Sequence, residues 1–264
     1  MYEDLGNGFV LFKQSVNVPE GIVEELDAAA VRTFEDHYKF VYDDNGDLLY
    51  SVNPSGHKWR AAVPPARVMS NLDPDFFGYC DRALYRNLIE YISLYPYVLP
   101  SLWWEVGGHV VVYRESASLG YHSDNDINYF PGETPPDQSA LQFALSGVVA
   151  LNDDYIGGKF RFHYLDITLE LERGDILLYP SNFIATHSVG YVESGTRYSY
   201  VTWFGQGSEA SDRNIEIHDY REPGIAGKTW LSDIRQDFHK YIIKNNLEIP
   251  AVLKRLPDHE GTMR

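Results

Sequence analysis

The sequence predicts a mainly β protein with flanking helices, an α+β chain whose jelly-roll or barrel core packs against N-terminal helices. Residues 103–205 contain short β-branched and aromatic runs separated by Gly, Pro, Asn and Asp, which is typical of antiparallel β architecture. Residues 1–102 and 206–264 instead carry apolar residues at helical spacing. Hydrophobic residues make up 44% of the 264 positions, which allows a substantial core. We therefore predict a single domain over residues 1–264.

The N-terminal flank, residues 1–102, is expected to contain two helices joined by loops. Asp73-Pro74 is typical of an N-cap followed by a first-turn proline, so one helix should run from there to about Tyr95. The stretches Asn53–Gly56 and Pro64-Pro65 are interpreted as irregular loop. Pro19 marks the start of the other helix, whose apolar residues recur at helical spacing: Ile22, Val23, Leu26, Ala29, Ala30 and Phe34.

The central region, residues 103–205, is expected to form the β core, and residues 206–264 a loop followed by a helix. Turn residues rather than long helices separate the central runs, which disfavours βαβ units. The predicted strands cover residues 109–113, 141–151, 159–164, 175–179, 187–192 and 197–204. The C-terminal helix is predicted from the helical spacing of Trp230, Ile234, Phe238, Tyr241 and Ile242.

The charge balance excludes broad classes of partner. The chain has 22 basic and 38 acidic side chains, a net charge of −16, whereas nucleic-acid and membrane-surface binders need basic patches. The lone Cys80 cannot form an intramolecular disulfide or a thiolate metal site. The N-terminus shows no signal-peptide pattern and no apolar run is long enough to cross a bilayer, so we expect a cytoplasmic protein. The sequence does not indicate an oligomeric state.

The tripeptide His122-Ser123-Asp124 is a candidate metal motif. On an extended segment residues i and i+2 project to the same side, so His122 and Asp124 can bind one ion together. With His187 as a distant third ligand, the set becomes two imidazoles and one carboxylate, which suits non-haem Fe(II) and leaves coordination positions open. A polar turn at residues 122–124 and a buried strand histidine at His187 are the alternatives. The strand histidines His109 and His163 are interpreted as packing or pocket-lining residues.

Two further residues suit a dicarboxylic cosubstrate beside such a metal. Arg197 follows His187 by ten positions and can form a two-pronged, charge-assisted hydrogen bond with a carboxylate. Tyr113 precedes His122 by nine positions and can donate a phenolic hydrogen bond to the same carboxylate.

At these residues the sequence resembles the Fe(II)/2-oxoglutarate-dependent dioxygenases, in particular their prolyl-4-hydroxylase-like branch. The resemblance covers residues 107–205, roughly, and its specificity lies in the order of the elements rather than in any one of them. These elements are Tyr113, His122-x-Asp124, Leu151-Asn152-Asp153 to Gly157-Gly158 with Phe160 and Phe162, Gly174-Asp175 with Tyr179-Pro180, and His187 to Gly195-x-Arg197.

The resemblance implies a double-stranded β-helix, or cupin-like jelly roll, as the catalytic core. It implies His122, Asp124 and His187 as Fe(II) ligands, Arg197 and Tyr113 as 2-oxoglutarate residues, dioxygen as the second cosubstrate and ascorbate as reductant. Collagen-type members carry lysine where this chain has Arg197, so the arginine points to bacterial, phage or regulatory relatives. Halogenases of the superfamily lack the carboxylate ligand, so Asp124 favours hydroxylation.

The expected function is hydroxylation of an unactivated C–H bond in a peptidyl prolyl residue or a small amino-acid-like molecule, with release of succinate and CO2. The alternatives are another oxidative outcome (desaturation, epoxidation or cyclisation), a non-enzymatic jelly-roll binding module, and a cupin-like metal protein without 2-oxoglutarate. Candidate substrate residues are Arg60 and Arg67 in a local basic cluster and Tyr129 in the long loop after Asp124. A solvated loop is an equally good interpretation of the basic cluster. Trp203 and Phe204 are interpreted as core, and Gly157-Gly158 as a hairpin turn.

Overall fold

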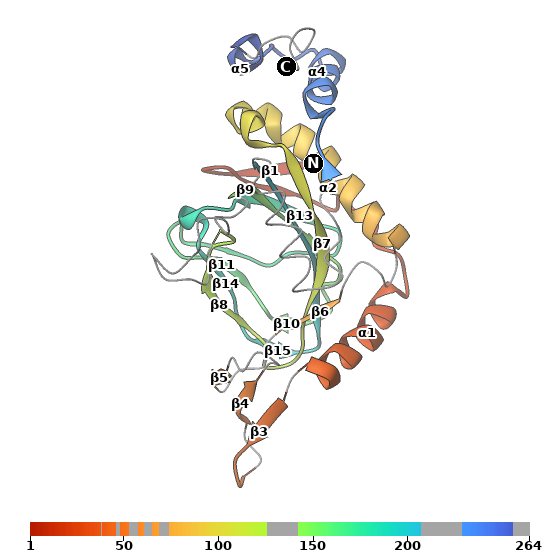
Figure 1. Ribbon diagram of the computed structural model, residues 1–264, viewed down its shortest axis with the longest axis vertical. Coiled ribbons are helices and arrows are strands. Elements are labelled where there is room, and N and C mark those ends of the chain that lie inside the picture. The colour runs from red at the N-terminus through yellow and green to blue at the C-terminus, as the bar shows by residue number, and fades with distance from the viewer. Residues whose placement is uncertain are drawn as a thin grey trace.

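Two antiparallel sheets face each other and enclose the inner core of the protein (Figure 1). The computed structural model describes residues 1–37, 39–45, 48–52, 58–60, 65–68, 74–125, 142–206 and 229–255. The larger sheet has eight strands in the order β1-β2-β13-β9-β16-β7-β17, and β6 also pairs with β7. Its strands are β1 (Tyr2–Gly6), β2 (Phe9–Phe12), β6 (Ala66–Val68), β7 (Trp104–Tyr113), β9 (Gln142–Ala150), β13 (Ile176–Pro180), β16 (Arg197–Gln206) and β17 (Thr229–Trp230).

The smaller of the facing sheets carries the histidines of the candidate metal motif. Its strand order is β12-β11-β14-β8. The strands are β8 (Leu119–His122), β11 (Phe160–Phe162), β12 (Ile167–Leu169) and β14 (His187–Val189). Two peripheral sheets are formed by β10 (Ile156–Gly157) with β15 (Val192–Ser194), and by β3 (Lys39–Tyr42), β4 (Leu48–Val52) and β5 (Lys58–Arg60).

Side chains alternate between the two faces of the large sheet, so each strand contributes to two separate cores. The inner core between the facing sheets includes Val111, Val148, Leu177, Phe162 and Val189. The outer core contains the intervening large-sheet residues, such as Val110, Val149 and Leu178, packed under helices. The large sheet is therefore buried on both faces.

The helices are α1 (Ile22–His37), α2 (Pro74–Leu94), the 3-10 helix η1 (Pro96–Ser101), α4 (Ile234–Lys244) and α5 (Ala251–Arg255), while the short η3 (Phe183–Ala185) follows β13. Helix α2 contacts β7, β9 and β13 of the large sheet, α1 contacts β6, and α4 packs on α2 (Figure 1). Their apolar stripes bury Leu26 of α1, Leu84, Leu88 and Ile92 of α2, and Phe238 of α4. The outer core thus holds helices from both ends of the chain against one sheet.

The predicted fold class is confirmed: a strand-rich jelly-roll core with flanking helices. Helices α1, α2 and α4 lie where apolar spacing predicts them, and the central strands overlap the predicted runs. Trp230, assigned from its spacing to the C-terminal helix, instead lies in β17 and pairs with Trp104. The description of residues 1–102 as a helical flank needs correction, because β1 and β2 belong to the large sheet and β2 pairs with β13. The run Phe9–Phe12 is buried at every position, as expected for a strand packed on both faces.

The loop predicted around Asn53–Gly56 and Pro64-Pro65 lies mostly outside the described residues. Its described neighbours form β5 and β6 rather than coil. Among the described helices, none is both long and apolar enough to cross a membrane. The assignment of residues 1–264 to one domain stays a prediction.

A buried carboxyl group, that of Glu105, and a partly buried one, that of Asp81, lie between α2 and the large sheet. Glu105 of β7 is 8% exposed, and its Oε1 has no hydrogen-bond partner among the described residues. Burial, with a further contribution from the charge of Asp81 on α2, raises the pKa of Glu105 to about 8. Burial also raises the pKa of Asp81, although the hydroxyl of Tyr200 donates a hydrogen bond to that carboxylate. Ionisation of Glu105 in the folded state is therefore unfavourable.

This burial makes stability depend on pH in a defined direction. Between about pH 4.5 and pH 8 the unfolded chain releases the Glu105 proton while the folded chain keeps it, so the free energy of unfolding falls as pH rises. The variant Glu105→Gln should lose this contribution and gain stability relative to wild type by up to about 1.4 kcal/mol per pH unit in that window. Urea unfolding at several pH values measures the difference. Glu115→Gln, at an exposed position, is the control; a Glu105→Gln difference that stays constant with pH would contradict the assignment.

Candidate active site

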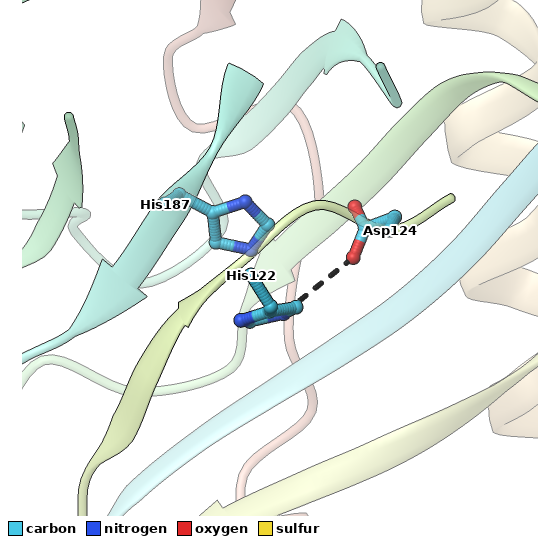
Figure 2. Close-up of side chains that lie close together, drawn as sticks. All are labelled: His122, Asp124 and His187. Atoms are coloured by element: carbon cyan, nitrogen blue, oxygen red, sulfur yellow. Dashed lines mark ion pairs between the residues drawn. The ribbon is translucent and has the colours of Figure 1, made fainter. Parts of the chain in front are cut away.

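The side chains of His122, Asp124 and His187 lie close together (Figure 2). His122 ends β8 and lies directly opposite His187, which begins β14. Asp124 follows His122 by two residues, and its Oδ1 is 3.7 Å from Nε2 of His122. One potential ligand atom from each residue lies within 4.8 Å of the other two, so a single cation can contact all three. The structure therefore brings together the predicted triad.

Backbone carbonyl groups orient both imidazole rings. Nδ1 of His122 is 2.9 Å from the Gly120 carbonyl oxygen, and Nδ1 of His187 is 2.9 Å from the Ala185 carbonyl oxygen. Because a carbonyl oxygen can only accept, each neutral ring carries its proton on Nδ1, which leaves the lone pair of Nε2 for a metal. Such hydrogen bonds at the second nitrogen are typical of metal-binding histidines.

Two hydroxyl groups orient the carboxylate of Asp124. Ser146 Oγ and Tyr179 Oη donate to Asp124 Oδ2 at 2.5 Å and 2.9 Å. Burial, together with the negative charge of Asp124, raises the pKa of Tyr179 well above its ordinary value, so its hydroxyl stays protonated and donates. Because Oδ2 is occupied by these donors, Oδ1 is the oxygen directed toward the histidines.

The triad is buried on the side of His187 and accessible to solvent on the side of His122. His187 is 3% exposed, and its ring stacks on Phe160 with centroids 4.7 Å apart and planes 15° apart. The side chain of His122 keeps 29% of its surface exposed, so that side of the site is accessible. Two neutral nitrogens and one carboxylate oxygen are the donors expected for Fe(II) in a facial arrangement, with positions left for other ligands.

A buried cation lies in the same inner space. Arg197, the first residue of β16, pairs directly with Tyr113 of β7, and its guanidinium carbon is 5.1 Å from the centre of the Tyr113 ring. Arg197 is 3% exposed, yet no carboxylate of the described residues forms an ion pair with it. A buried charge is costly without a partner, so this position suits a bound anion.

Gly158 makes room for the Arg197 side chain. A Cβ atom at Gly158 would lie 3.1 Å from Arg197 Cδ and 3.2 Å from Val192 Cγ2. The backbone of Gly158 has φ of +61°, a conformation that favours glycine. The pair Gly157-Gly158, interpreted from sequence as a hairpin turn, therefore also forms part of the wall around Arg197.

The sequence interpretation missed Ser199. This residue follows Arg197 by two positions, so both side chains lie on the inner face of β16. Ser199 is 2% exposed, and its Oγ has no hydrogen-bond partner among the described residues. The strand periodicity from Arg197 was the signal that could have identified it. Together the two residues offer a cation and a hydroxyl to one anion.

The same row of inward residues ends at Trp203, close to the triad. Trp203 pairs with Ser146, the residue that donates to Asp124. Its ring stacks on Phe143 at 5.5 Å and contacts His109 at the same distance. The interpretation of Trp203 as core is therefore incomplete, because it lies on the barrel interior beside the triad. Phe204 points the other way and is fully buried under the helices, as predicted for core.

The remaining predicted residues do not meet the triad in the described structure. His163 is exposed, and its ring contacts Tyr121 at 5.0 Å. The strands β5 and β6 place the backbones of Arg60 and Arg67, and Arg67 pairs with Val111 of β7, but their side chains lie outside the described part of the chain. Tyr129 also lies outside the described residues.

The sequence comparison agrees with this geometry. Residues 101–205, which contain the triad and Arg197, match the sequence model of the 2OG-Fe(II) oxygenase superfamily. Residues 101–205 are therefore similar in sequence to a 2OG-Fe(II) oxygenase domain. The matched segment is less than half of the chain, and it begins just before β7 and ends within β16. Enzymes of this superfamily are dioxygenases that use Fe(II), 2-oxoglutarate and dioxygen, so the cofactors and the enzyme class predicted from sequence are confirmed.

Solved structures with a similar fold include prolyl hydroxylases. A viral collagen prolyl hydroxylase from Paramecium Bursaria Chlorella virus-1, in complex with 2OG, is 13% identical with TM-score 0.48, covering 77% of this chain and 98% of that one. A Trichoplax adhaerens prolyl hydroxylase, bound to a hypoxia inducible factor peptide fragment, is 12% identical with TM-score 0.49, covering 78% and 87%. A Pseudomonas putida prolyl-4-hydroxylase is 16% identical with TM-score 0.44, covering 76% and 94%. A comparison with curated protein sequences finds no match.

The two hydroxyl donors to Asp124 lead to a prediction for a variant that lacks one of them. The variant Tyr179→Phe should weaken binding of Mn(II), a redox-inert substitute for Fe(II), by about tenfold, because loss of an outer hydrogen bond reduces the orientation of the ligand. Isothermal titration calorimetry measures this affinity. Tyr191→Phe, at a residue 60% exposed, should bind as wild type does. Equal affinities for Tyr179→Phe and wild type would show that Tyr179 does not support the metal ligand.

Proposed function

We propose that this 2OG-Fe(II) oxygenase is a hydroxylase of a peptidyl prolyl residue or a small amino-acid-like molecule. One atom of dioxygen enters a C–H bond of the substrate, and the other enters succinate as 2-oxoglutarate loses CO2. The observation that carries the proposal is the presence, in one inner space, of a His-Asp-His triad and a buried arginine without an anionic partner among the described residues. The first suits Fe(II), and the second suits the distal carboxylate of 2-oxoglutarate.

Each residue of the site has a defined task in this proposal. Nε2 of His122, Nε2 of His187 and Oδ1 of Asp124 would hold Fe(II), which supplies the redox chemistry of dioxygen when bound. Arg197 would bind the distal carboxylate of 2-oxoglutarate and so orient the molecule, with Ser199 and Tyr113 as hydroxyl donors. The apolar surroundings of His187 exclude water from the buried side of the site.

The carboxylate of Asp124 supports hydroxylation in preference to halogenation. It occupies the third protein position at the metal, where a halogenating relative would need space for a halide ion. The substrate would approach from the side of His122, because His187 is buried against Phe160 and Phe162 in the inner core. Trp203 and Phe143 would form the opposite wall of the entrance. The prolyl part of the proposal rests on the ordered motifs from Tyr113 to Arg197.

Turnover of 2-oxoglutarate tests the reaction class, and product mass tests the outcome. Protein with Fe(II), ascorbate and 2-oxoglutarate should release succinate slowly, and faster with the correct member of a set of amino acids and proline-containing peptides. Hydroxylation adds one oxygen atom to that substrate, whereas desaturation removes two hydrogens. Asp124→Ala should lose metal binding and turnover, whereas Asp44→Ala at an exposed turn should keep both. Absence of both metal and 2-oxoglutarate binding in the wild-type protein would overturn the proposal.

Removal of the Ser199 hydroxyl tests the cosubstrate assignment separately from the metal. Ser199→Ala should raise the Michaelis constant for 2-oxoglutarate about tenfold, as expected for loss of one hydrogen bond to a charged group. Its affinity for Mn(II) should not change, because Ser199 does not contact the triad. Steady-state succinate release and calorimetry give the two values. Ser194→Ala, at an exposed position on β15, is the control. An unchanged Michaelis constant in Ser199→Ala would exclude this hydroxyl from the cosubstrate site.

A further inference from the structure

We propose that Asn152 is a positioning residue of the cosubstrate site. Its side-chain amide holds the backbone on both sides of Arg197, at Thr196 and at Tyr198, and thereby sets the direction of the guanidinium group. This inference rests on the proposed function, in which Arg197 binds the distal carboxylate of 2-oxoglutarate. The side chain of Asn152 forms its hydrogen bonds with Asp154, Thr196 and Tyr198, so we expect its effect on Arg197 to act through the backbone.

The side chain of Asn152 forms hydrogen bonds with the backbone of the segment around Arg197 just beyond the end of the β9–β16 pairing. The pairing of β9 with β16 ends at Ala150 opposite Ser199, and the backbone N–H of Leu151 still donates to the Tyr198 carbonyl at 3.0 Å. At the next residue, Asn152, the side chain forms the hydrogen bonds to this segment. The Tyr198 N–H donates to Asn152 Oδ1 at 2.8 Å, and Asn152 Nδ2 donates to the Thr196 carbonyl at 2.7 Å. Asn152 therefore bonds the residues immediately before and after Arg197.

The surrounding donors and acceptors determine how the amide is oriented. An N–H group can only donate, so the atom facing the Tyr198 N–H must be the Asn152 oxygen. The nitrogen then faces two acceptors, the Thr196 carbonyl and Asp154 Oδ1, the latter at 2.7 Å. Asn152 is only 4% exposed, so water does not compete freely for these bonds. The amide consequently holds β16 in a single arrangement.

Arg197 lies at the end of a strand, where hydrogen bonds from Asn152 can affect its position. It is the first residue of β16, and it follows a turn in which Gly195 has φ of +80°. Strand ends open more easily than strand centres because they have fewer neighbours. On one edge Arg197 pairs with Tyr113 of β7, while the opposite edge of this segment is held by Asn152. Without the amide, the strand end could twist and move the guanidinium away from the metal site.

The outer face of the same segment is held independently by α1. The Tyr198 hydroxyl donates to Asp27 Oδ1 at 2.5 Å, and Arg114, the neighbour of Tyr113, forms an ion pair with the same carboxylate at 3.0 Å. These contacts do not involve Asn152. A variant at Asn152 should therefore keep the strand in the sheet while it loses the support at the edge.

The test compares two cosubstrates that differ only in the distal carboxylate. 2-Oxoglutarate carries this group, and 2-oxovalerate has the same carbon chain without it. Calorimetry on the Mn(II)-loaded protein gives a dissociation constant for each. In Asn152→Ala, the affinity for 2-oxoglutarate should fall about tenfold while that for 2-oxovalerate and for Mn(II) changes little, because only the distal carboxylate reaches Arg197. A general loss of structure would weaken both cosubstrates equally.

A second variant at Asn152 and a control variant at another buried asparagine complete the test. Asn152→Asp retains an acceptor for the Tyr198 N–H but places an oxygen opposite the Thr196 carbonyl, so it should also reduce the preference for 2-oxoglutarate, even where Asn152→Ala does not fold. Asn87→Ala removes another buried asparagine, which donates to the Ala83 carbonyl within α2, and should leave the preference unchanged.

Arg197→Met separates this inference from the proposed function. If Arg197→Met binds 2-oxoglutarate as tightly as wild type does, the cosubstrate assignment itself is wrong. If Arg197→Met loses the preference for 2-oxoglutarate while both Asn152 variants keep it, the assignment stands and only the positioning role of Asn152 is overturned. A reduced preference in the Asn152 variants, approaching that of Arg197→Met, supports the inference.

Discussion

The site depends above all on the pairing of β8 with β14, which places His122 directly opposite His187. The two rings lie with centroids 4.3 Å apart, and each is oriented by a carbonyl two residues earlier in the chain, that of Gly120 in β8 and that of Ala185 at the end of η3. The backbone that leads into each histidine thus also selects the nitrogen available to a metal. Asp124 joins them because the chain continues past His122 toward Ser146 and Tyr179, whose hydroxyls hold its other oxygen. The distance between the two histidine ligands consequently depends on the pairing of β8 with β14.

The net charge of −16 disfavours the binding of an anion unless positive charge is supplied close to it. A divalent cation and a dianionic cosubstrate must be held in an acidic protein, so the positive charge has to be local. Arg197 supplies it within the barrel, where the surrounding apolar side chains strengthen any interaction with a carboxylate. Its guanidinium is held away from water by Tyr113, Gly158 and the sheet itself. The overall charge therefore says little about the charge of the ligand that the barrel can bind.

The large sheet has helices on one face and the site on the other, and this arrangement explains which features were predictable. The helices α1, α2 and α4 follow from local apolar spacing, because an amphipathic helix encodes its buried face within a few turns. The strand β2 was missed because a short run that is buried on both faces does not alternate. In the sequence, Asn152 is distinguished only as part of the Leu151-Asn152-Asp153 motif. Its partners lie 44 and 46 residues further along the chain, so no local pattern shows its role.

The sequence by itself determined the fold class and the chemistry of the donor set, because residue type and short-range periodicity are local properties. His122, Asp124, His187, Arg197 and Tyr113 could all be identified in this way. Only the tertiary structure decided which oxygen of Asp124 faces the histidines, that Arg197 is buried beside Tyr113, and that Ser199 and Trp203 face the same interior. These properties depend on how strands far apart in the chain align with one another. Such alignment is set by packing across both sheets, which no single segment contains.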